Sequence, residues 1–325
     1  MAAPGQRVRK HIVVAVAIAV GSGVLSGCGV QTLASYNAAQ SAGATALVQQ
    51  QAPDGEKAAP VIDAIKPDAA IAATVPDAIR AKGLTLSTSV GYPPMEIYAP
   101  DGQTIVGVDP AIGLAIARVL GLRLTVTNED FNAQIPGVLT GRYDLVMSSM
   151  SDTKERQAKV TFVDYVSAGA GFLVKHGNPD QIKAPADMCG HTLSVVDNGS
   201  SLMLAEKYNK ACVAEGKPAI DLLRMTGDQD ALLALKSGRA QLNITDYVVA
   251  ASKAADPKEG VDAVTLKGTE SPWGIAMNPQ NKALIDAVQA ALTKLIESGD
   301  YAKILQAWQV PALATDKATI NGATS

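Results

Sequence analysis

The stretch from Tyr143 to Arg156 gathers side chains that could hold a small charged molecule. Its apolar run over 145–147 predicts a short strand buried on both faces of a sheet. Hydroxyl side chains follow this strand at Ser148, Ser149 and Ser151. Asp152 and Glu155 have a spacing like that of a capping box, so a helix is expected to begin here with Arg156 in its first turns. The exit of a buried strand therefore carries hydroxyls and a guanidinium.

This combination of groups suits a carboxylate at the edge of a sheet. In open α/β sheets, ligands bind in the crevice at the carboxyl ends of the strands. The planar fork of Arg156 matches a carboxylate with two hydrogen bonds, and serine hydroxyls can both donate and accept. The stretch predicts a socket for a small zwitterion. The alternative is an ordinary helix start, with a solvated Arg156 and serines that only cap.

A second strand exit has the same kind of chemistry. Residues 192–196 predict a strand, and a helix is expected over 202–210. Between them lie Gly199, Ser200 and Ser201. The free N–H groups and the dipole at a helix start both favour an anion, so this segment could contact a carboxylate. A serine at such a position often caps the helix and does nothing more.

A carboxylate stands at a third strand exit. Residues 241–244 predict a strand that leads into Asp246. Arg156 with the segment 199–201 could hold a carboxylate, whereas Asp246, helped by the segment 148–151, could accept from an ammonium group. These are the two ends of an α-amino acid. A lone aspartate after a strand is more often a cap or turn residue, so the argument depends on the combination.

These strand exits require an α/β fold to position them. The 325 residues are enough for two domains, since single domains usually have about 100 to 200 residues. The first half alternates a strand over 84–90, a helix over 108–120, a strand over 122–127 and a helix over 132–139. This alternation indicates an α/β lobe with right-handed crossovers, and the second half repeats the pattern.

The N-terminus predicts export and a lipid anchor. Basic residues precede an apolar run over 12–20, which is shorter than the roughly 20 residues that span a bilayer and is typical of a secretion signal. Leu25-Ser26-Gly27-Cys28 matches the lipobox pattern. We therefore expect a signal peptide over 1–27 and membrane lipid attached to Cys28, at the extracellular face of the cell membrane. An ordinary cleavage site is the alternative.

Composition excludes some partners and predicts a linker. Residues 28–75 are rich in Ala, Gln, Pro and Ser without a sustained apolar period, so a flexible tether is expected there. The formal net charge is −3, and no basic block follows the signal. Nucleic acid is therefore not an expected partner.

The cysteines also agree with a location outside the cell membrane. The chain has 3 cysteines. If Cys28 carries lipid, Cys189 and Cys212 remain as a pair, and a disulfide is expected between them in an oxidising compartment. His191 lies near this pair, but two cysteines and one histidine match no structural zinc pattern. We expect no metal and no cofactor.

Several segments of the sequence resemble those of one protein family. From about Pro76 to Val310, the chain is similar to the extracellular solute-binding proteins of polar amino-acid ABC importers. The matching segments are residues 101–109, 135–144, 148–156, 198–201 and 299–301. The resemblance implies a two-lobed periplasmic-binding-protein-like fold with two crossover hinge strands. Its expected parts are lobe 1 at 76–167 and 276–311, lobe 2 at 168–275, and a C-terminal tail at 312–325.

The resemblance also implies how the two ends of an amino acid are held. In that family, the arginine that matches Arg156 grips the α-carboxylate, assisted by the residues that match Ser200 and Ser201. The aspartate that matches Asp246 takes the α-amino group. It does so together with the segment that matches Ser149 and Ser151.

The ligand side chain is expected between two aromatic residues, Tyr92 and Phe131, again by resemblance. Members that hold cationic side chains carry an acidic residue where this chain has Ser89. This departure favours an uncharged polar ligand over a basic one. Asp130 and Asp152 lie near enough in sequence to keep the question open, although each could equally be a turn or cap residue.

The expected function is recognition, not catalysis. Arg156 and Asp246 belong to different lobes, so an amino acid would contact both only when the lobes close, and a membrane permease would recognise the closed monomer. Two alternatives stay open, an amino-acid sensor that feeds a membrane signalling protein and a dehydratase-type enzyme on the same fold. No hydrolase, metalloprotease or phosphate-loop motif accompanies the remaining histidines, His176 and His191.

Overall fold

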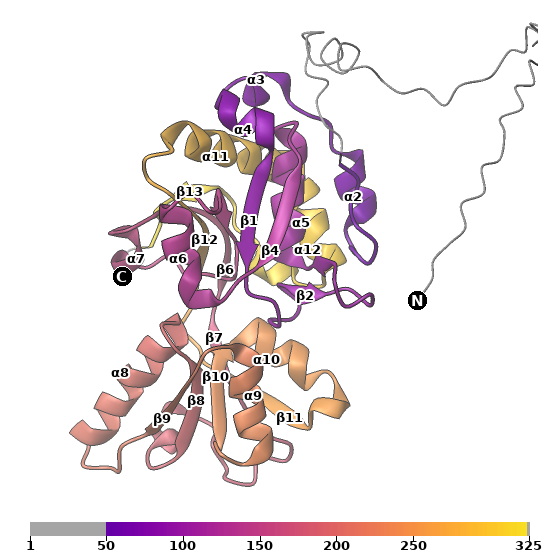
Figure 1. Ribbon diagram of the computed structural model, residues 1–325. Helices are drawn as coiled ribbons and strands as arrows, with labels where there is room; N and C mark the ends of the chain where they lie inside the picture. The colour runs from indigo at the N-terminus through magenta and orange to yellow at the C-terminus, as the bar shows by residue number, and fades with distance from the viewer. Residues whose placement is uncertain (1–49, 324–325) are drawn as a thin grey trace, which may run out of the picture. The chain divides into compact units, whose positions relative to one another are not determined.

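The computed structural model describes residues 50–323 of the chain. The predicted signal peptide, Cys28 and the start of the predicted tether lie outside these residues. Between residues 50 and 323 the chain forms two large sheets and one short hairpin, with helices packed on the sheets (Figure 1). No helix in this part of the chain combines the length and the apolar character needed to cross a membrane.

Lobe 1 is built on a six-stranded sheet with the strand order β13-β6-β12-β5-β1-β4. Its strands are β1 (Leu84–Thr88), β4 (Leu124–Asn128), β5 (Leu145–Val146), β6 (Thr161–Ala168), β12 (Ser271–Met277) and β13 (Thr319–Ile320). Because β1 is parallel to both β4 and β5, the carboxyl ends of these three strands meet at one edge of the sheet. The serines after β5 therefore lie at a sheet edge that is available to a ligand.

The helices of lobe 1 shield its sheet from water. They are α4 (Asp77–Lys82), α5 (Val108–Val119), α6 (Phe131–Leu139), α7 (Lys154–Gln157), α11 (Lys282–Glu297) and α12 (Asp300–Ala307). Every residue of α5 is buried, because this helix is apolar on most of its surface and packs against both α11 and α12. The hairpin of β2 (Ile97–Tyr98) and β3 (Ile105–Val106) precedes α5.

Lobe 2 has a five-stranded sheet with the order β11-β7-β10-β8-β9. Its strands are β7 (Ala170–Lys175), β8 (Thr192–Val196), β9 (Asp221–Met225), β10 (Leu242–Asp246) and β11 (Val261–Thr265). Its helices are α8 (Ser200–Ala214), α9 (Asp228–Ser237) and α10 (Tyr247–Ala254). Cys189 and Cys212 form a disulfide that ties the segment before β8 to the end of α8.

The chain crosses between the two sheets twice. It leaves lobe 1 where β6 runs into β7, and it returns between β11 and β12 (Figure 1). The predicted α/β fold of two lobes with two crossing segments is confirmed. The whole of β12 pairs with lobe 1 strands, so the return lies before Ser271 and not at the expected boundary of 275 and 276.

The expectation of a tether is wrong from residue 50 onward. Residues 59–64 and 69–72 form the helices α2 (Ala59–Ala64) and α3 (Ala69–Ala72). Ile62, Ile65 and Val75 are buried in the core of lobe 1. The guanidinium of Arg118 donates to the carbonyl oxygens of Gln50, Ile62 and Asp63. A few well-spaced apolar residues were enough to bury this segment, although its average composition is typical of a linker.

The expectation of a separate C-terminal tail is also wrong within the described residues. β13 pairs antiparallel with β6, which makes it an edge strand of lobe 1. The backbone N–H of Ala323 donates to Asp152, and that of Gly322 donates to Asp164. Asp152 is therefore buried in this contact and does not cap the next helix. The cap of α7 is Thr153, whose hydroxyl accepts from the backbone N–H of Arg156.

Candidate ligand-binding site

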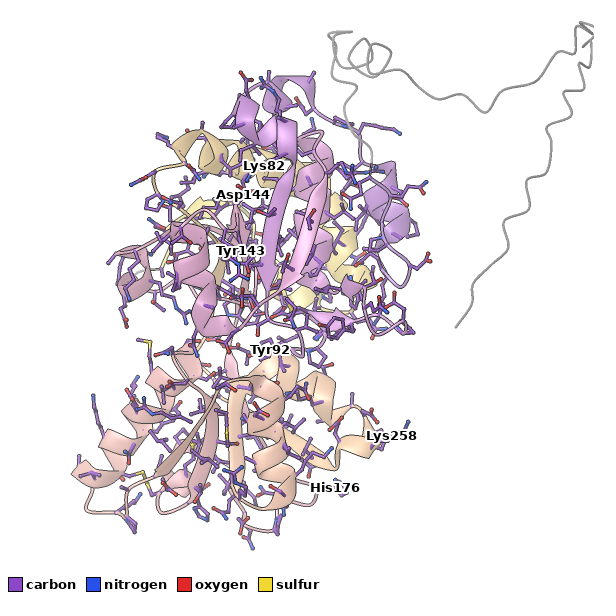
Figure 2. All side chains as sticks on the ribbon, viewed as in Figure 1. Lys82, Tyr92, Tyr143, Asp144, His176 and Lys258 are labelled. Carbon is purple, nitrogen blue, oxygen red and sulfur yellow. A yellow bond between two sulfur atoms is a disulfide. The ribbon has the colours of Figure 1, made fainter. Side chains whose placement is uncertain are left out.

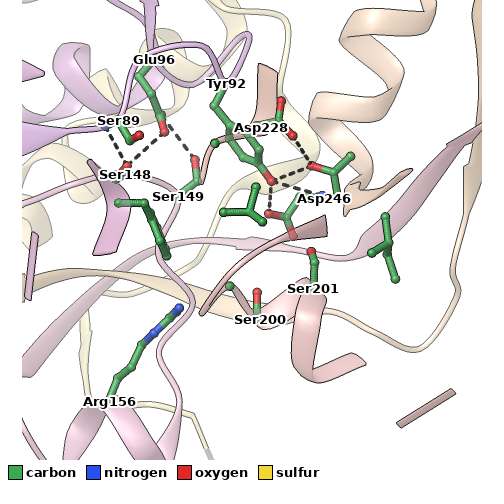
Figure 3. Close-up of a pocket in the computed structure, with 16 residues that line it drawn as sticks. Ser89, Tyr92, Glu96, Ser148, Ser149, Arg156, Ser200, Ser201, Asp228 and Asp246 are labelled. Atoms are coloured by element: carbon green, nitrogen blue, oxygen red, sulfur yellow. Dashed lines mark hydrogen bonds between the residues drawn. The ribbon is translucent and has the colours of Figure 1, made fainter. Parts of the chain in front are cut away.

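A cavity lies where the exposed edges of the two sheets face each other. About 560 Å³ of empty space lies between its walls, including space that is open to solvent. Lobe 1 contributes Ser89, Tyr92, Glu96, Phe131, Ser148, Ser149 and Arg156. Lobe 2 contributes Val196, Gly199, Ser200, Ser201, Gly227, Asp228, Ile244, Thr245 and Asp246 (Figure 3). Every predicted ligand-binding residue except Ser151 lines this cavity.

Arg156 is a buried, pre-oriented cation on α7. Its Nη1 donates to the carbonyl oxygen of Ser151 at 2.8 Å, and its Nη2 donates to that of Asn198 at 2.9 Å. Its guanidinium carbon lies 5.5 Å from the ring centre of Phe131. Burial lowers its pKa, but arginine stays charged in proteins. Because an arginine has five N–H donors, the fork is held in place while donors remain for a ligand.

The start of α8 offers N–H groups beside this arginine. Gly199 is the N-cap residue, and no side chain caps the helix. Ser200 and Ser201 are the first residues of the helix and line the cavity. Ser151 Oγ donates to Ser200 Oγ at 2.9 Å, so Ser151 joins the lobes and supports Ser200 from behind the cavity wall. This helix start is suited to an anion.

Asp246 is a buried carboxylate at the end of β10. Its side chain accepts from the hydroxyl of Tyr92 at 2.5 Å, and that hydroxyl also lies 3.0 Å from Thr245 Oγ1. Burial raises the pKa of Asp246 to about 6, while Tyr92 and Arg156 act in the opposite direction. Tyr92 lies between the two lobes, whereas His176 lies on the surface of lobe 2, paired with Asp262 (Figure 2).

Glu96 is a cavity residue that the sequence reasoning missed. It is buried beside Asp109, and its carboxyl group lies 3.4 Å from Ser148 Oγ and 3.5 Å from Ser149 Oγ. Burial raises the pKa of Glu96 well above its ordinary value, and the charge of Asp109 raises it further. Asp109 is the better ionised partner because it accepts hydrogen bonds from Tyr165 and from the backbone of Ser149. Of the two carboxyl groups, Glu96 is therefore the one whose neutral form is favoured.

Asp228 is a second missed carboxylate. It lies in the first turn of α9, directly after Gly227. Its Oδ1 accepts from Thr245 Oγ1 at 3.2 Å, and its Oδ2 accepts from the ammonium group of Lys253 on α10. A glycine followed by an acidic residue before a helix was the signal that could have found it. For Glu96, which directly precedes β2, the sequence offers no comparable signal.

Comparison with known proteins decides the family. A model of the bacterial extracellular solute-binding proteins, family 3, matches residues 84–311. The chain belongs to this family. The resemblance seen in the sequence is thereby confirmed, and it covers both lobes of the solute-binding protein.

Relatives of this solute-binding protein carry the names of amino acids. The arginine-binding protein ArgT of Corynebacterium glutamicum is 32% identical over 239 residues, which is 73% of this chain and 78% of that protein. The glutamine-binding protein GlnH of an ABC transporter in Bacillus subtilis is 28% identical over 213 residues, 64% of this chain and 74% of that protein. An ancestral arginine-binding protein, solved with arginine bound, is 30% identical with a TM-score of 0.64, covering 70% of this chain and 97% of that one.

Proposed function

We propose that this solute-binding protein captures an α-amino acid between its lobes and delivers it to an ABC importer. The observation that carries the proposal is the cavity in which a buried cation, Arg156, and a buried carboxylate, Asp246, come from opposite lobes. Arg156 and the start of α8 would hold the α-carboxylate. Asp246 would accept from the α-ammonium group, helped by Ser149. Tyr92 and Phe131 would enclose the side chain.

Binding would favour closure of the lobes. Hydrogen bonds already join them across the cavity, from Tyr92 to Asp246, from Ser151 to Ser200, and from Arg156 to the carbonyl of Asn198. A ligand that contacts both lobes stabilises the arrangement in which they are together. In our proposal, the permease recognises this arrangement of a monomer that is held at the extracellular face of the membrane by lipid on Cys28.

The charges of the cavity favour an uncharged polar side chain. Burial and the charge of Asp109 raise the pKa of Glu96 and so favour its neutral form, and Asp228 is paired with Lys253. Asp246 would be engaged by the α-ammonium group. Among the residues that line the cavity, none of these carboxyl groups then remains for a cationic side chain. Glutamine is the amino acid that we would test first. Arginine is the rival, because several relatives are named for it.

The test is a ligand screen by thermal unfolding and calorimetry. The protein is first unfolded, dialysed and refolded so that no ligand is carried over from the cell. A ligand at 100 times its dissociation constant adds about 2.7 kcal/mol to the free energy of unfolding. Stabilisation by glutamine above arginine is expected. Stabilisation by arginine alone would contradict the proposed preference, and no stabilisation by any of the twenty amino acids would contradict the proposed function.

The same protein preparation distinguishes an importer component from the two alternatives, a dehydratase and a sensor. Prephenate is included in the screen, and its consumption is followed by absorbance, because a dehydratase would turn it over while a binding protein would not. A pull-down from membranes distinguishes an importer from a sensor. Recovery of a permease supports the proposal, and recovery of a membrane kinase without a permease supports the sensor.

Affinity should depend on pH through Asp246. Its pKa is raised to about 6, so it is ionised above that pH and protonated below it. The ammonium group of a ligand interacts favourably only with the ionised form. The affinity is therefore expected to be constant from about pH 7 to about pH 8, and to fall by up to about tenfold per pH unit below about pH 6. Calorimetric titrations across this range provide the measurement.

A variant that removes a different titrating group provides the control. Burial raises the pKa of Asp164 to about 7, and Asp164 contacts Gly322 and does not line the cavity. In Asp164→Asn, the decline in affinity below about pH 6 should persist. A profile that is flat down to about pH 5 in the parent protein would show that Asp246 does not receive the ammonium group.

A further inference from the structure

Lys253 does not line the cavity, yet its ammonium group contacts a carboxylate that does. We propose that Lys253 sets the charge preference of the site, because it neutralises Asp228 without lining the cavity itself. This inference rests on the proposed function and deepens it, because it names the residue that selects an uncharged side chain over a cationic one. Lys253 is a positioning residue, since it acts on the ligand only through Asp228.

Asp228 is placed where a ligand side chain would meet it. It lines the cavity together with Tyr92, Thr245 and Asp246 (Figure 3). Thr245 Oγ1 lies between these groups, 3.2 Å from Asp228 and 3.0 Å from the hydroxyl of Tyr92. Asp228 is therefore adjacent to the proposed ammonium-binding group without being that group. An unpaired carboxylate at this place would attract a cationic side chain.

Lys253 cancels that attraction because the pair is buried. The side chain of Lys253 is only 3% exposed, and that of Asp228 is 8% exposed. Buried charges interact strongly and are poorly screened by salt. Burial lowers the pKa of Lys253 to about 7, and its contact with Asp228 favours the ammonium form. The nearby Glu259 forms its own ion pair with Lys236, at 2.7 Å, so Asp228 is the direct partner of Lys253.

Both members of the pair belong to lobe 2. Asp228 begins α9 and Lys253 lies near the end of α10, and these helices pack on the same five-stranded sheet. Movement of one lobe relative to the other therefore leaves the pair intact. The charge preference is then a fixed property of lobe 2, present before and after the lobes close on a ligand.

The test replaces Lys253 with methionine, which has similar length and no charge. At about pH 7, where Asp246 is largely ionised, the ratio of the dissociation constants for arginine and glutamine should shift at least about tenfold toward arginine, because the cationic side chain now supplies the counter-ion of Asp228. Lys253→Arg retains a cation and should keep the ratio of the parent. Calorimetry with free arginine and free glutamine provides both constants.

A second variant predicts a shift of the opposite sign. In Asp228→Asn, the ammonium group of Lys253 loses its carboxylate, so glutamate should gain at least about tenfold relative to glutamine. This variant keeps the proposal testable if Lys253→Met does not fold. A purely structural role of Lys253 would weaken all ligands together and leave the ratios unchanged, which would overturn the inference. Failure of the parent to bind any amino acid would overturn the proposed function itself.

Discussion

Replacing Arg156 with alanine is expected to weaken amino acid binding about 30-fold or more, which corresponds to about 2 to 5 kcal/mol. The carboxylate of the ligand would lose a bidentate, charge-assisted partner in a cavity that is largely shielded from water. The variant also loses the hydrogen bond from Arg156 to the carbonyl of Asn198, which joins the two lobes. Calorimetry with the ligand from the screen measures the effect directly.

Two further variants show whether the guanidinium itself is required. Arg156→Lys keeps the positive charge but replaces the planar fork with a point charge, so it should also bind weakly. Arg142→Ala is the matched control, because Arg142 is an exposed arginine of lobe 1 that pairs with Glu129 and does not line the cavity. It should bind as the parent does. Equal affinity of parent and Arg156→Ala would disprove the carboxylate assignment.

A polypeptide that begins at residue 76 is expected to be much less stable than one that begins at residue 50. The shorter chain lacks Ala58 and three larger apolar side chains of the lobe 1 core, Ile62, Ile65 and Val75. Each fully buried aliphatic side chain contributes about 1.5 to 3 kcal/mol, so their loss removes at least about 5 kcal/mol. Since whole domains are stable by about 5 to 15 kcal/mol, the shorter chain could unfold at room temperature.

Buried polar groups increase the expected loss. Arg118 is 2% exposed, and its guanidinium donates to carbonyl oxygens of residues 50–63, which the shorter chain lacks. The indole N–H of Trp308 donates to Glu56 at 2.7 Å and would lose that partner too. Buried polar groups without partners each cost about 1 to 3 kcal/mol. The midpoint of urea unfolding, followed by circular dichroism, compares the two chains.

Single substitutions in the longer chain separate burial from chain length. Ile62→Ala should cost about 2 to 5 kcal/mol, because Ile62 is fully buried. Lys66→Ala, at an exposed position in the same segment, should change the stability by less than about 0.5 kcal/mol. If both truncated chains unfolded at the same urea concentration, residues 50–75 would not belong to the core.

Local patterns in the sequence were sufficient for the elements and for most of the site. Strands and helices alternate with clear start and stop residues, and the carboxyl ends of parallel strands always meet at one edge of a sheet. Polar residues at the ends of such strands or in the segments that follow them, including Asp246, Ser200 and Arg156, were therefore expected to gather there. Helix α5 was equally readable, because its apolar residues recur with the period of a helix.

The burial of residues 50–75 could not be predicted from local patterns. The composition of residues 50–75 is that of a linker, and only a few residues, such as Ile62, are both large and apolar. Those residues are buried because distant parts of the chain receive them, with Arg118 on α5 and Trp308 after α12 supplying hydrogen bonds to the same segment. Packing against residues so far away in sequence leaves no local signal.

The charge of the cavity was likewise decided by the tertiary structure. From the sequence, Glu96 and Asp228 are two acidic residues among many, and both would be ionised in water. In the folded chain, burial and then the charge of Asp109 raise the pKa of Glu96, and Lys253 pairs with Asp228. The sequence alone thus determined most of the groups that reach the cavity, because they lie at or after strand ends. Only the fold decided which of them carry a free charge, because that depends on burial and on partners from other elements.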